Sequence, residues 1–254
     1  MNVAGLPVLV DGLTAANGIV YAGSGKGFGA YNGKTGEPLW LNKGWAQGEA
    51  TTSRPLLADG VIVSGANWRG FYGNDAKTGE LLWKLDKDGI TDRGATPALV
   101  DGLLYVAARK SLFIIDSRSG RVVVRKELPF NVQVNSTPLV TDNLIIVGTQ
   151  TDGMVALDRQ TFEVKWTART SPALIYTAPY SRHPAATIET SPVLIGKTVY
   201  FGASDGIIYG VDKESGRTIW KHKTGAPLFS TLTTDGRMIF AADFGGNVYA
   251  FNIN

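Results

Sequence analysis

The sequence predicts an all-β protein, a β-propeller built from four-stranded antiparallel blades. Two patterns with one shared period predict this fold: a nine-residue frame that ends in tryptophan, and a small polar residue followed by proline. Between these landmarks, short apolar runs alternate with turn pairs such as Asp-Gly, the expected signals of hairpins. Four short strands in a repeat of about 42 residues match the size of a propeller blade.

The nine-residue frame reads Asp or Asn, two residues, Thr or Ser, Gly, three residues and Trp. Its copies end 43, 41, 42 and 54 residues apart, and a sixth copy begins at Asn252. The third copy ends in Val124 instead of Trp, and the fourth carries Phe162 in place of Gly. We interpret these two copies as weakened and locally repacked. The five copies occupy residues 32–40, 75–83, 116–124, 158–166 and 212–220.

The second pattern precedes a turn and an apolar run in every repeat after the first. The last repeat keeps the small polar residue at Thr231 but has Leu232 where the others have proline. The four proline steps are Arg54-Pro55, Thr96-Pro97, Thr137-Pro138 and Ser191-Pro192. The chain therefore shows six repeats, which predict a six-bladed propeller or part of a seven- or eight-bladed parent.

Composition excludes several classes of protein and site. The 254 residues contain no Cys, so disulfides, thiolate metal sites and Cys nucleophiles are absent. The net charge of +3 comes from interspersed charges without a basic stripe, and we expect no nucleic-acid partner. No apolar run reaches the length of a membrane span, so we expect no direct membrane insertion. The first residues carry no signal-peptide pattern.

The frame, preceded by a Gly-rich strand, resembles the pyrroloquinoline-quinone-like propeller repeat over essentially the whole chain. The family includes quinoprotein dehydrogenases and the propeller lipoprotein of the outer-membrane assembly machine. The resemblance implies that the frame tryptophans dock on the neighbouring blade, and one large side chain per repeat suits that role. The structural docking residues predicted in this way are Trp40, Trp83, Trp166 and Trp220.

Residues outside the repeat are candidates for binding. In an antiparallel meander, the inter-blade connections and the turns between second and third strands share one rim. That rim receives an insertion at Thr170–Ala186 and a varied set of aromatic and cationic residues, types enriched at binding hot spots. We predict a protein or glycan partner there; the alternative is that these loops vary freely. The rim candidates are Trp45, Trp68, Arg69, Arg109, Lys110, Tyr176, Tyr180, Arg182, His183 and Phe244.

The sequence argues against a catalytic role, and we predict no catalytic, metal-binding or cofactor-binding residues. Quinoprotein alcohol dehydrogenases of the family carry an adjacent Cys pair over the cofactor, which this chain lacks. His183 and His222 have no partner at metal-ligand spacing, and Asp205 and Asp243 are interpreted as turn residues. Two alternatives stay open: a quinone- and Ca²⁺-dependent oxidoreductase domain, and an accessory domain of an enzyme outside this chain.

We expect residues 1–254 to form a single propeller domain from the C-terminal part of a longer protein. Residues 1–13 could supply a closing strand, because the last copy of the frame stops before its outer strand. The resemblance implies a periplasmic or extracellular location. The oligomeric state and the identity of the partner are not encoded in a recognisable pattern.

Overall fold

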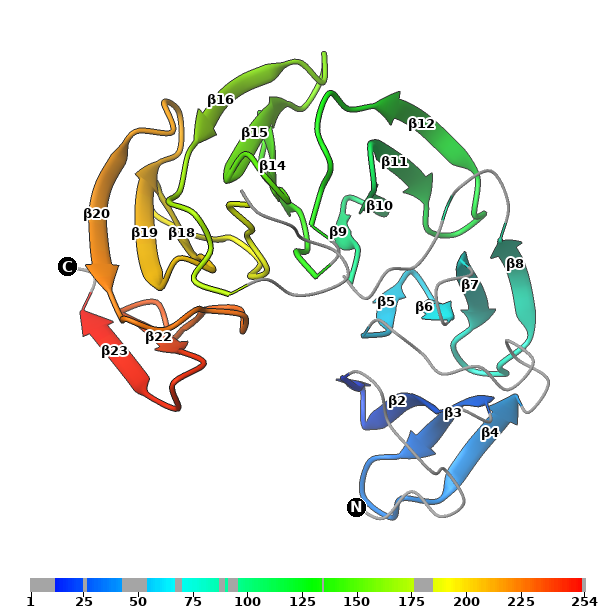
Figure 1. The fold of residues 1–254 in the computed structure, drawn as a ribbon. Helices are drawn as coiled ribbons and strands as arrows, with labels where there is room; N and C mark the ends of the chain where they lie inside the picture. Colours follow the sequence, from blue (N-terminus) through cyan, green and yellow to red (C-terminus); the bar gives the residue numbers. More distant parts are fainter. Residues whose placement is uncertain are drawn as a thin grey trace. The chain divides into compact units, whose positions relative to one another are not determined.

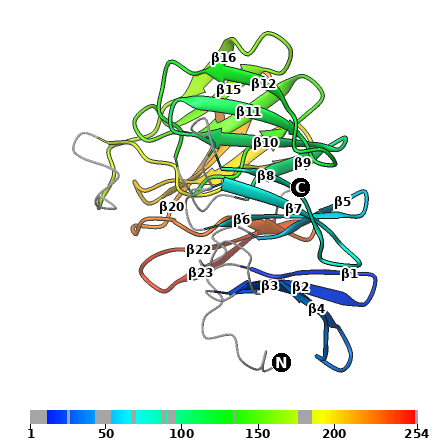
Figure 2. The ribbon, with the colours of Figure 1, turned by 90° about the vertical axis from the view of Figure 1, so that its right-hand side faces the viewer.

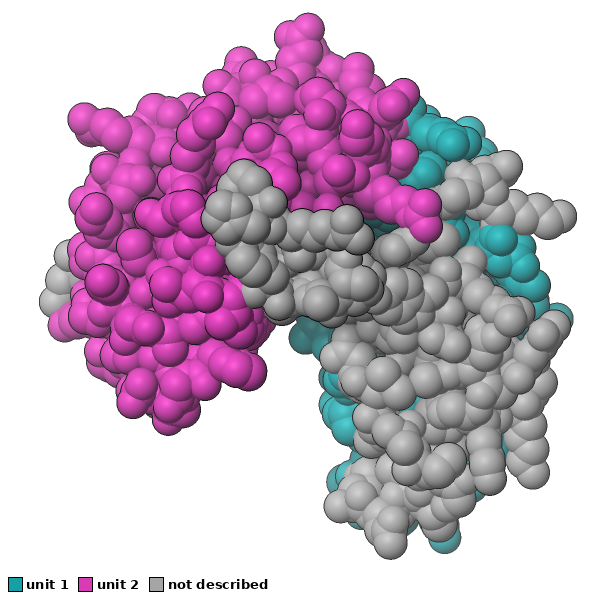
Figure 3. All heavy atoms as spheres, in the orientation of Figure 1, with its two compact units in different colours: residues 1–108, 113–125 teal, residues 109–112, 126–254 magenta. Residues whose placement is uncertain are grey.

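A computed structural model describes residues 12–24, 27–42, 54–66, 70–86, 90, 96–133, 135–175 and 185–252. Its described residues form six antiparallel sheets, which confirms the predicted all-β propeller fold. The chain divides into two compact units, coloured teal and magenta in Figure 3: residues 1–108 with 113–125, and residues 109–112 with 126–254. The described part of the chain contains no helix that is long and apolar enough to cross a membrane.

The first unit contains the first two sheets and most of the third, each with four strands in chain order across the sheet. Figure 2 shows strands β1 to β4 side by side as one twisted sheet. The strands are β1 (Thr14–Ala16), β2 (Ile19–Ser24), β3 (Gly27–Asn32) and β4 (Pro38–Asn42), then β5 (Leu56–Ala58), β6 (Val61–Ala66), β7 (Gly70–Asp75) and β8 (Leu81–Leu85), then β9 (Ala98–Val100), β10 (Leu103–Ala108), β11 (Ser111–Asp116) and β12 (Val122–Glu127).

The second unit contains two four-stranded sheets and a last sheet in which three strands are described. They appear in green, yellow to orange, and red in Figure 1. The strands are β13 (Leu139–Val140), β14 (Leu144–Gly148), β15 (Met154–Asp158) and β16 (Val164–Ala168), then β17 (Val193–Ile195), β18 (Thr198–Gly202), β19 (Ile207–Asp212) and β20 (Thr218–Lys223), then β21 (Thr233–Thr234), β22 (Met238–Ala242) and β23 (Val248–Asn252).

The repeated sequence patterns account for the two turns on one side of each blade. Asp59 and Gly60 join the first two strands of the second sheet with φ values of 49° and 81°, the positive pair that a type I′ hairpin requires. In the frame, Asp75 accepts hydrogen bonds from the backbone N–H groups of Lys77 and Thr78 at 2.9 and 2.8 Å. These bonds hold the pKa of Asp75 below its ordinary value, with the Thr78 N–H as the largest cause.

The small polar residues of the second pattern link the first strands of neighbouring sheets. Within the first unit, the Arg54 N–H donates to Thr96 Oγ1 at 3.1 Å. Within the second unit, the Thr137 N–H donates to Ser191 Oγ at 2.9 Å, and the Ser191 N–H to Thr231 Oγ1 at 3.1 Å. The hydroxyl therefore satisfies a backbone donor that no sheet ladder pairs, which explains why a Ser or Thr recurs there.

The core of each unit lies between the faces of consecutive sheets. In the first unit, Phe71 of the second sheet packs in one cluster with Leu104 and Phe113 of the third. In the second unit, Met154 of the fourth sheet packs with Phe201 and Val211 of the fifth. Because both faces of an inner blade are covered in this way, the second and third strands are almost continuously apolar instead of alternating.

Candidate functional site

Connections between sheets and turns between second and third strands meet on one rim of the second unit. The N–H groups of Leu128 and Val132, in the connection after β12, donate to the carbonyl oxygens of Lys110 and Arg109 at 2.7 and 2.8 Å. The turn between β22 and β23 is held in the same way, because the Phe244 N–H donates to the Pro227 carbonyl at 2.8 Å. These contacts agree with the meander topology that predicts a shared rim.

The described ends of the insertion are fastened to this rim. The Ser171 N–H donates to Asp205 Oδ2 at 2.9 Å, and the Leu174 N–H donates to the Ser204 carbonyl at the same distance. The two ends also meet each other, because the Ala173 N–H donates to the Ala185 carbonyl at 2.8 Å. The insertion thus begins and ends against the turn between β18 and β19.

An apolar patch lies on the rim beside these anchors. Phe244 is 70% exposed, and Leu174 and Ile175 are 53% and 41% exposed. The Phe244 ring packs edge-on against the half-buried Phe229 ring, with centroids 5.4 Å apart. We call Leu174, Ile175, Phe229 and Phe244 the rim patch.

The parts of the rim patch belong to one continuous surface. A Cβ built on Gly206 would lie 3.0 Å from Leu174 Cδ1 and 3.1 Å from the backbone of Ala226. A Cβ built on Gly245 would lie 3.3 Å from Ala226 Cβ. Ala226 therefore lies between the loop that carries Leu174 and the loop that carries Phe244.

A buried carboxylate of the fifth sheet, Asp205, holds the start of the insertion by a hydrogen bond. Asp205, 5% exposed, accepts hydrogen bonds from the Tyr209 hydroxyl at 2.6 Å and the Ile207 N–H at 3.0 Å, besides that of Ser171. Burial raises the pKa of Asp205, although these donors oppose the shift. Burial is the largest cause that raises the pKa of Tyr209, and the hydrogen bond to Asp205 is the second. The turn role predicted for Asp205 fits these bonds.

The sixth sheet has a similar Asp–Tyr pair, but the pKa of its Asp is shifted in the opposite direction. Asp243 accepts the N–H groups of Gly245 and Asn247 at 2.9 and 3.0 Å and the Tyr249 hydroxyl at 2.8 Å. The Asn247 N–H is the largest cause that holds the pKa of Asp243 below its ordinary value. The hydrogen bond to Asp243 raises the pKa of Tyr249. Asp243 is therefore also a turn residue, as predicted.

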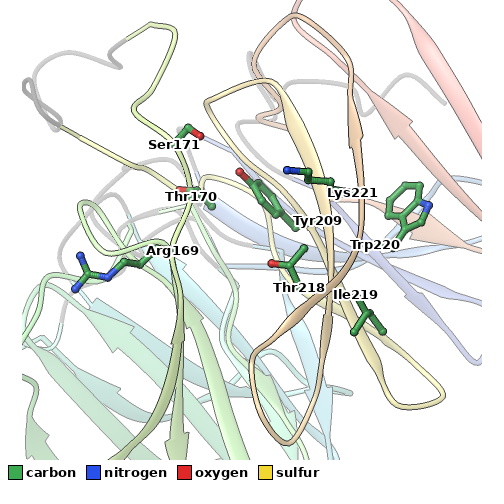
Figure 4. Close-up of a pocket in the computed structure, with 8 residues that line it drawn as sticks. All are labelled: Arg169, Thr170, Ser171, Tyr209, Thr218, Ile219, Trp220 and Lys221. Carbon is green, nitrogen blue, oxygen red and sulfur yellow. The ribbon is translucent and has the colours of Figure 1, made fainter.

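A pocket of about 550 Å³ opens between the end of β16 and the outer strand β20. Arg169 and Lys221 contribute positive charge to its lining, and the Tyr209 hydroxyl points toward Thr170 and Ser171 (Figure 4). Thr170 Oγ1 is buried and has no hydrogen-bond partner among the described residues. The lining of the pocket is thus polar and carries positive charge.

A third buried carboxylate, Glu189, was not predicted. It is 3% exposed and accepts hydrogen bonds from the side-chain amides of Gln133 at 2.5 Å and Asn135 at 2.8 Å. The sequence does carry a signal, because Glu189 and Asn135 each stand three residues before the proline of a proline step. Within the described residues there is no group of three or more His, Asp or Glu side chains that could hold a metal ion.

Three frame tryptophans reach the following repeat in the way that a docking role requires. Trp83 Nε1 donates to the Ser117 carbonyl at 3.0 Å, and Trp166 Nε1 donates to the Lys213 carbonyl at 2.8 Å. The same indoles lie over the frame glycines of those repeats, since a Cβ on Gly120 or Gly216 would be 2.6 Å from the ring. Trp40 makes the equivalent contacts with Ala76 and Gly79.

The fourth tryptophan, Trp220, and the second histidine, His222, lie together on the outer strand β20. The Trp220 ring packs edge-on against Phe251 of β23, with centroids 5.2 Å apart. His222 stacks on Trp220 and lies 4.7 Å from the Phe251 ring. The surroundings of His222 are thus aromatic. How much the four tryptophans stabilise the fold stays a prediction.

Of the ten rim candidates, three are described. Arg109 and Lys110 are exposed in the turn between β10 and β11, where Arg109 has a positive φ of 55°. Phe244 is the most exposed member of the rim patch. Sequence reasoning missed Leu174, Ile175 and Phe229, although Leu174 and Ile175 lie inside the predicted insertion. The candidates outside the described residues are Trp45, Trp68, Arg69, Tyr176, Tyr180, Arg182 and His183, as are residues 1–11 of the possible closing strand.

A family model described as outer membrane protein assembly factor BamB matches residues 3–94 and 72–254. The chain is 26% identical to that factor from Salmonella typhimurium over 306 aligned residues, covering 96% of the chain and 71% of the relative. It is 28% identical to the Escherichia coli factor over 170 residues, covering 64% of the chain and 38% of the relative. A quinoprotein alcohol dehydrogenase, PedH of Pseudomonas putida, is 25% identical over 181 residues, covering 65% of the chain and 29% of that enzyme.

Two solved structures share the fold. BamB from Moraxella catarrhalis has a TM-score of 0.60 and 18% identity, covering 97% of this chain and 84% of that one. The computationally designed protein Ika8 has a TM-score of 0.72 and 17% identity, covering 95% of this chain and 70% of that one. Likeness to a designed protein carries no information about activity.

Proposed function

Because the chain belongs to the family of the outer membrane protein assembly factor BamB, we propose that it is a non-catalytic propeller scaffold that binds a protein partner through the rim of its second unit. The name of the relatives describes an assembly factor, and assembly requires contact with other proteins. We place this activity in the periplasm or outside the cell on the same ground.

The rim patch is the observation that carries the proposal. Large apolar side chains that project from turns lose water on binding, and Phe is among the residues enriched in interface cores. The backbone under them is held by hydrogen bonds from Ser171, Leu174 and Phe244. Binding therefore needs little ordering of the loops, which lowers its entropic cost.

Site-specific photo-cross-linking tests the proposed surface. A benzophenone amino acid is placed at Leu174 or Phe244 and, as a matched control, at Val164, which is 45% exposed on the outer strand β16. In the cells that make the protein, we expect the two rim positions to give the same discrete protein adduct and position 164 to give none. Adducts that are identical at all three positions, or absent from both rim positions, would contradict the proposal.

Three alternatives have their own tests: an oxidoreductase domain, since a quinoprotein dehydrogenase is also a relative of the chain, a glycan partner, and an accessory role beside an enzyme. Calorimetry with pyrroloquinoline quinone and Ca²⁺, followed by dye reduction with a primary alcohol, tests the oxidoreductase alternative. Tight binding with turnover would replace the scaffold proposal. A glycan partner would be indicated by retention on immobilised oligosaccharides that Phe244→Ala abolishes. An accessory role predicts that the cross-linked adduct contains an enzyme.

A further inference from the structure

The sequence contains the dipeptide Asn-Gly twice, and both copies lie in turns of the first sheet. Asn17-Gly18 joins β1 to β2, and Asn32-Gly33 begins the first frame at the end of β3. Asparagine is a chemically labile residue. Its side-chain amide can be attacked by the backbone nitrogen of the next residue, and a following glycine has no side chain to hinder the approach. The two copies therefore offer the same chemistry in two different surroundings.

The first copy lies in an open hairpin turn. Asn17 and Gly18 have φ values of 52° and 75°, the positive pair of a two-residue type I′ turn. Both residues are exposed, and a Cβ built on Gly18 would meet nothing within 4 Å. In the described part of the chain, the Asn17 side chain and the Gly18 N–H form no hydrogen bond. Neither reacting group is therefore held away from the other.

The second copy is fixed by hydrogen bonds at both reacting groups. Asn32 Oδ1 accepts the N–H groups of Lys34 at 2.9 Å and Thr35 at 3.1 Å. The Gly33 N–H donates to the Gly18 carbonyl at 2.7 Å. The side-chain amide is thus turned toward the frame, and the nitrogen that would attack it is turned toward the hairpin. Reaction at Asn32 requires that these three hydrogen bonds open, and each of them adds to the barrier.

We propose that Asn17 is a site of spontaneous deamidation in the folded protein, whereas Asn32 is protected. The Gly18 nitrogen bonds to Cγ of Asn17, its proton passes to the side-chain nitrogen, and that nitrogen leaves as ammonia. Water then opens the cyclic imide at one of two bonds. Cleavage between Cγ and the nitrogen gives aspartate. Cleavage between the main-chain carbonyl carbon and the nitrogen gives isoaspartate, in which the backbone continues through Cβ and Cγ.

The aspartate product fits the turn without rearrangement. The equivalent hairpin turns of the second and third sheets are Asp59-Gly60 and Asp101-Gly102, with φ values of 49° and 81° and of 51° and 72°. An aspartate at position 17 therefore reproduces a turn that the first unit already contains twice.

The isoaspartate product conflicts with the register of the hairpin. Strands β1 and β2 pair Ala16 with Ile19, which leaves room for two residues of normal length between them. An additional backbone carbon displaces the Gly18 carbonyl, the acceptor of the Gly33 N–H. The corresponding bonds in the next two sheets run from Ala76 to Gly60 at 2.8 Å and from Ser117 to Gly102 at 2.9 Å. Formation of isoaspartate thus removes a link that each of these sheets uses between its hairpin and its frame.

Peptide mapping of the full chain tests the proposal. The folded protein is incubated at neutral pH in water enriched in heavy oxygen and then digested with trypsin in ordinary water, which places Asn17 in peptide 1–26 and Asn32 in peptide 27–34. Electron-transfer fragmentation locates the incorporated oxygen at residue 17 and distinguishes isoaspartate from aspartate. We expect Asn17 to react at least about tenfold faster than Asn32, because three hydrogen bonds oppose the reaction at Asn32. Equal rates, or faster reaction of Asn32, would overturn the proposal.

The same chain unfolded in urea is the matched control. Without the fold, both Asn-Gly pairs should react at comparable rates. A preference for Asn17 that persists in urea would assign the difference to the flanking sequence and overturn the proposal, as would a folded Asn17 that stays intact while the unfolded one reacts. Release of ammonia by the folded protein is an independent measurement. It should largely disappear in Asn17→Asp and persist in Asn32→Asp, and the reverse pattern would overturn the proposal.

Discussion

The fifth and sixth sheets contain the same Asp–Tyr pair with opposite electrostatic properties. Asp205 and Tyr209 bond at 2.6 Å, and Asp243 and Tyr249 bond at 2.8 Å. Burial raises the pKa of Asp205, whereas hydrogen bonds lower the pKa of Asp243. At Asp205 burial is the largest cause and outweighs the hydrogen bond from Ser171 of the insertion, whereas at Asp243 the N–H of Asn247, within the same turn, is the largest cause. The ionisation of each carboxylate thus depends on the balance between its burial and the hydrogen bonds of its turn.

The largest expected effect on stability comes from comparing a buried frame tryptophan with a half-buried one. Trp83 is 9% exposed and has its indole N–H bonded to Ser117, so Trp83→Ala should lower the free energy of unfolding by about 3–5 kcal/mol. Trp220 is half-buried, and Trp220→Ala should cost roughly half as much. Urea unfolding followed by circular dichroism measures both. Equal costs would show that the exposed fraction of the indole does not determine its contribution to stability.

The frame glycines give the next largest effect. Gly216 has a positive φ of 68°, and its added Cβ would meet the Trp166 ring at 2.6 Å. Gly216→Ala should therefore cost about 2–4 kcal/mol, from strain and from displacement of the indole. Gly236 has φ of 90° but nothing within 4 Å, so Gly236→Ala should cost only about 1 kcal/mol.

Thermal unfolding of the two glycine variants separates the clash from the backbone strain. If Gly236→Ala proves as costly as Gly216→Ala, backbone strain alone explains the frame glycine. Phe162 already occupies the frame glycine position with φ of 60°. It follows the one repeat without Trp, so its side chain displaces no frame indole. Phe162→Gly should consequently leave stability within about 1 kcal/mol of wild type.

The features that the sequence could predict are those encoded by neighbouring residues. Asp59-Gly60 specifies its own turn, and a frame Asp such as Asp75 bonds residues two and three positions on. The contacts that built the candidate site join distant segments. Ser171 meets Asp205 across 34 residues, and Gln133 meets Glu189 across 56. Such pairs depend on how sheets and connections pack, and a residue type alone does not specify its distant partner.

The pH dependence of stability should distinguish the two Asp–Tyr pairs. A lowered pKa means that Asp243 stabilises the fold above about pH 4, and that this contribution disappears as the pH falls through the folded-state pKa. The raised pKa of Asp205 has the reverse effect: its contribution is greatest below about pH 4 and is lost as the pH rises through the raised value.

Asn variants at the two positions isolate these contributions. The stability lost in Asp243→Asn should grow from pH 3 to pH 7, whereas the stability lost in Asp205→Asn should shrink over the same range. Denaturant unfolding at several pH values measures both slopes against wild type. Parallel slopes would mean that the cover over Asp205 does not change its ionisation.

The smallest effect on stability is expected where the effect on binding should be greatest. Phe244 is 70% exposed and its ring touches only Phe229 among the aromatic contacts of the described residues, so Phe244→Ala should change the free energy of unfolding by less than about 0.5 kcal/mol. The same variant should lose the cross-linked partner when the probe is at Leu174. A large loss of stability would instead indicate that Phe244 packs as part of the sixth sheet. A structural role would then account for this exposed ring without a binding partner.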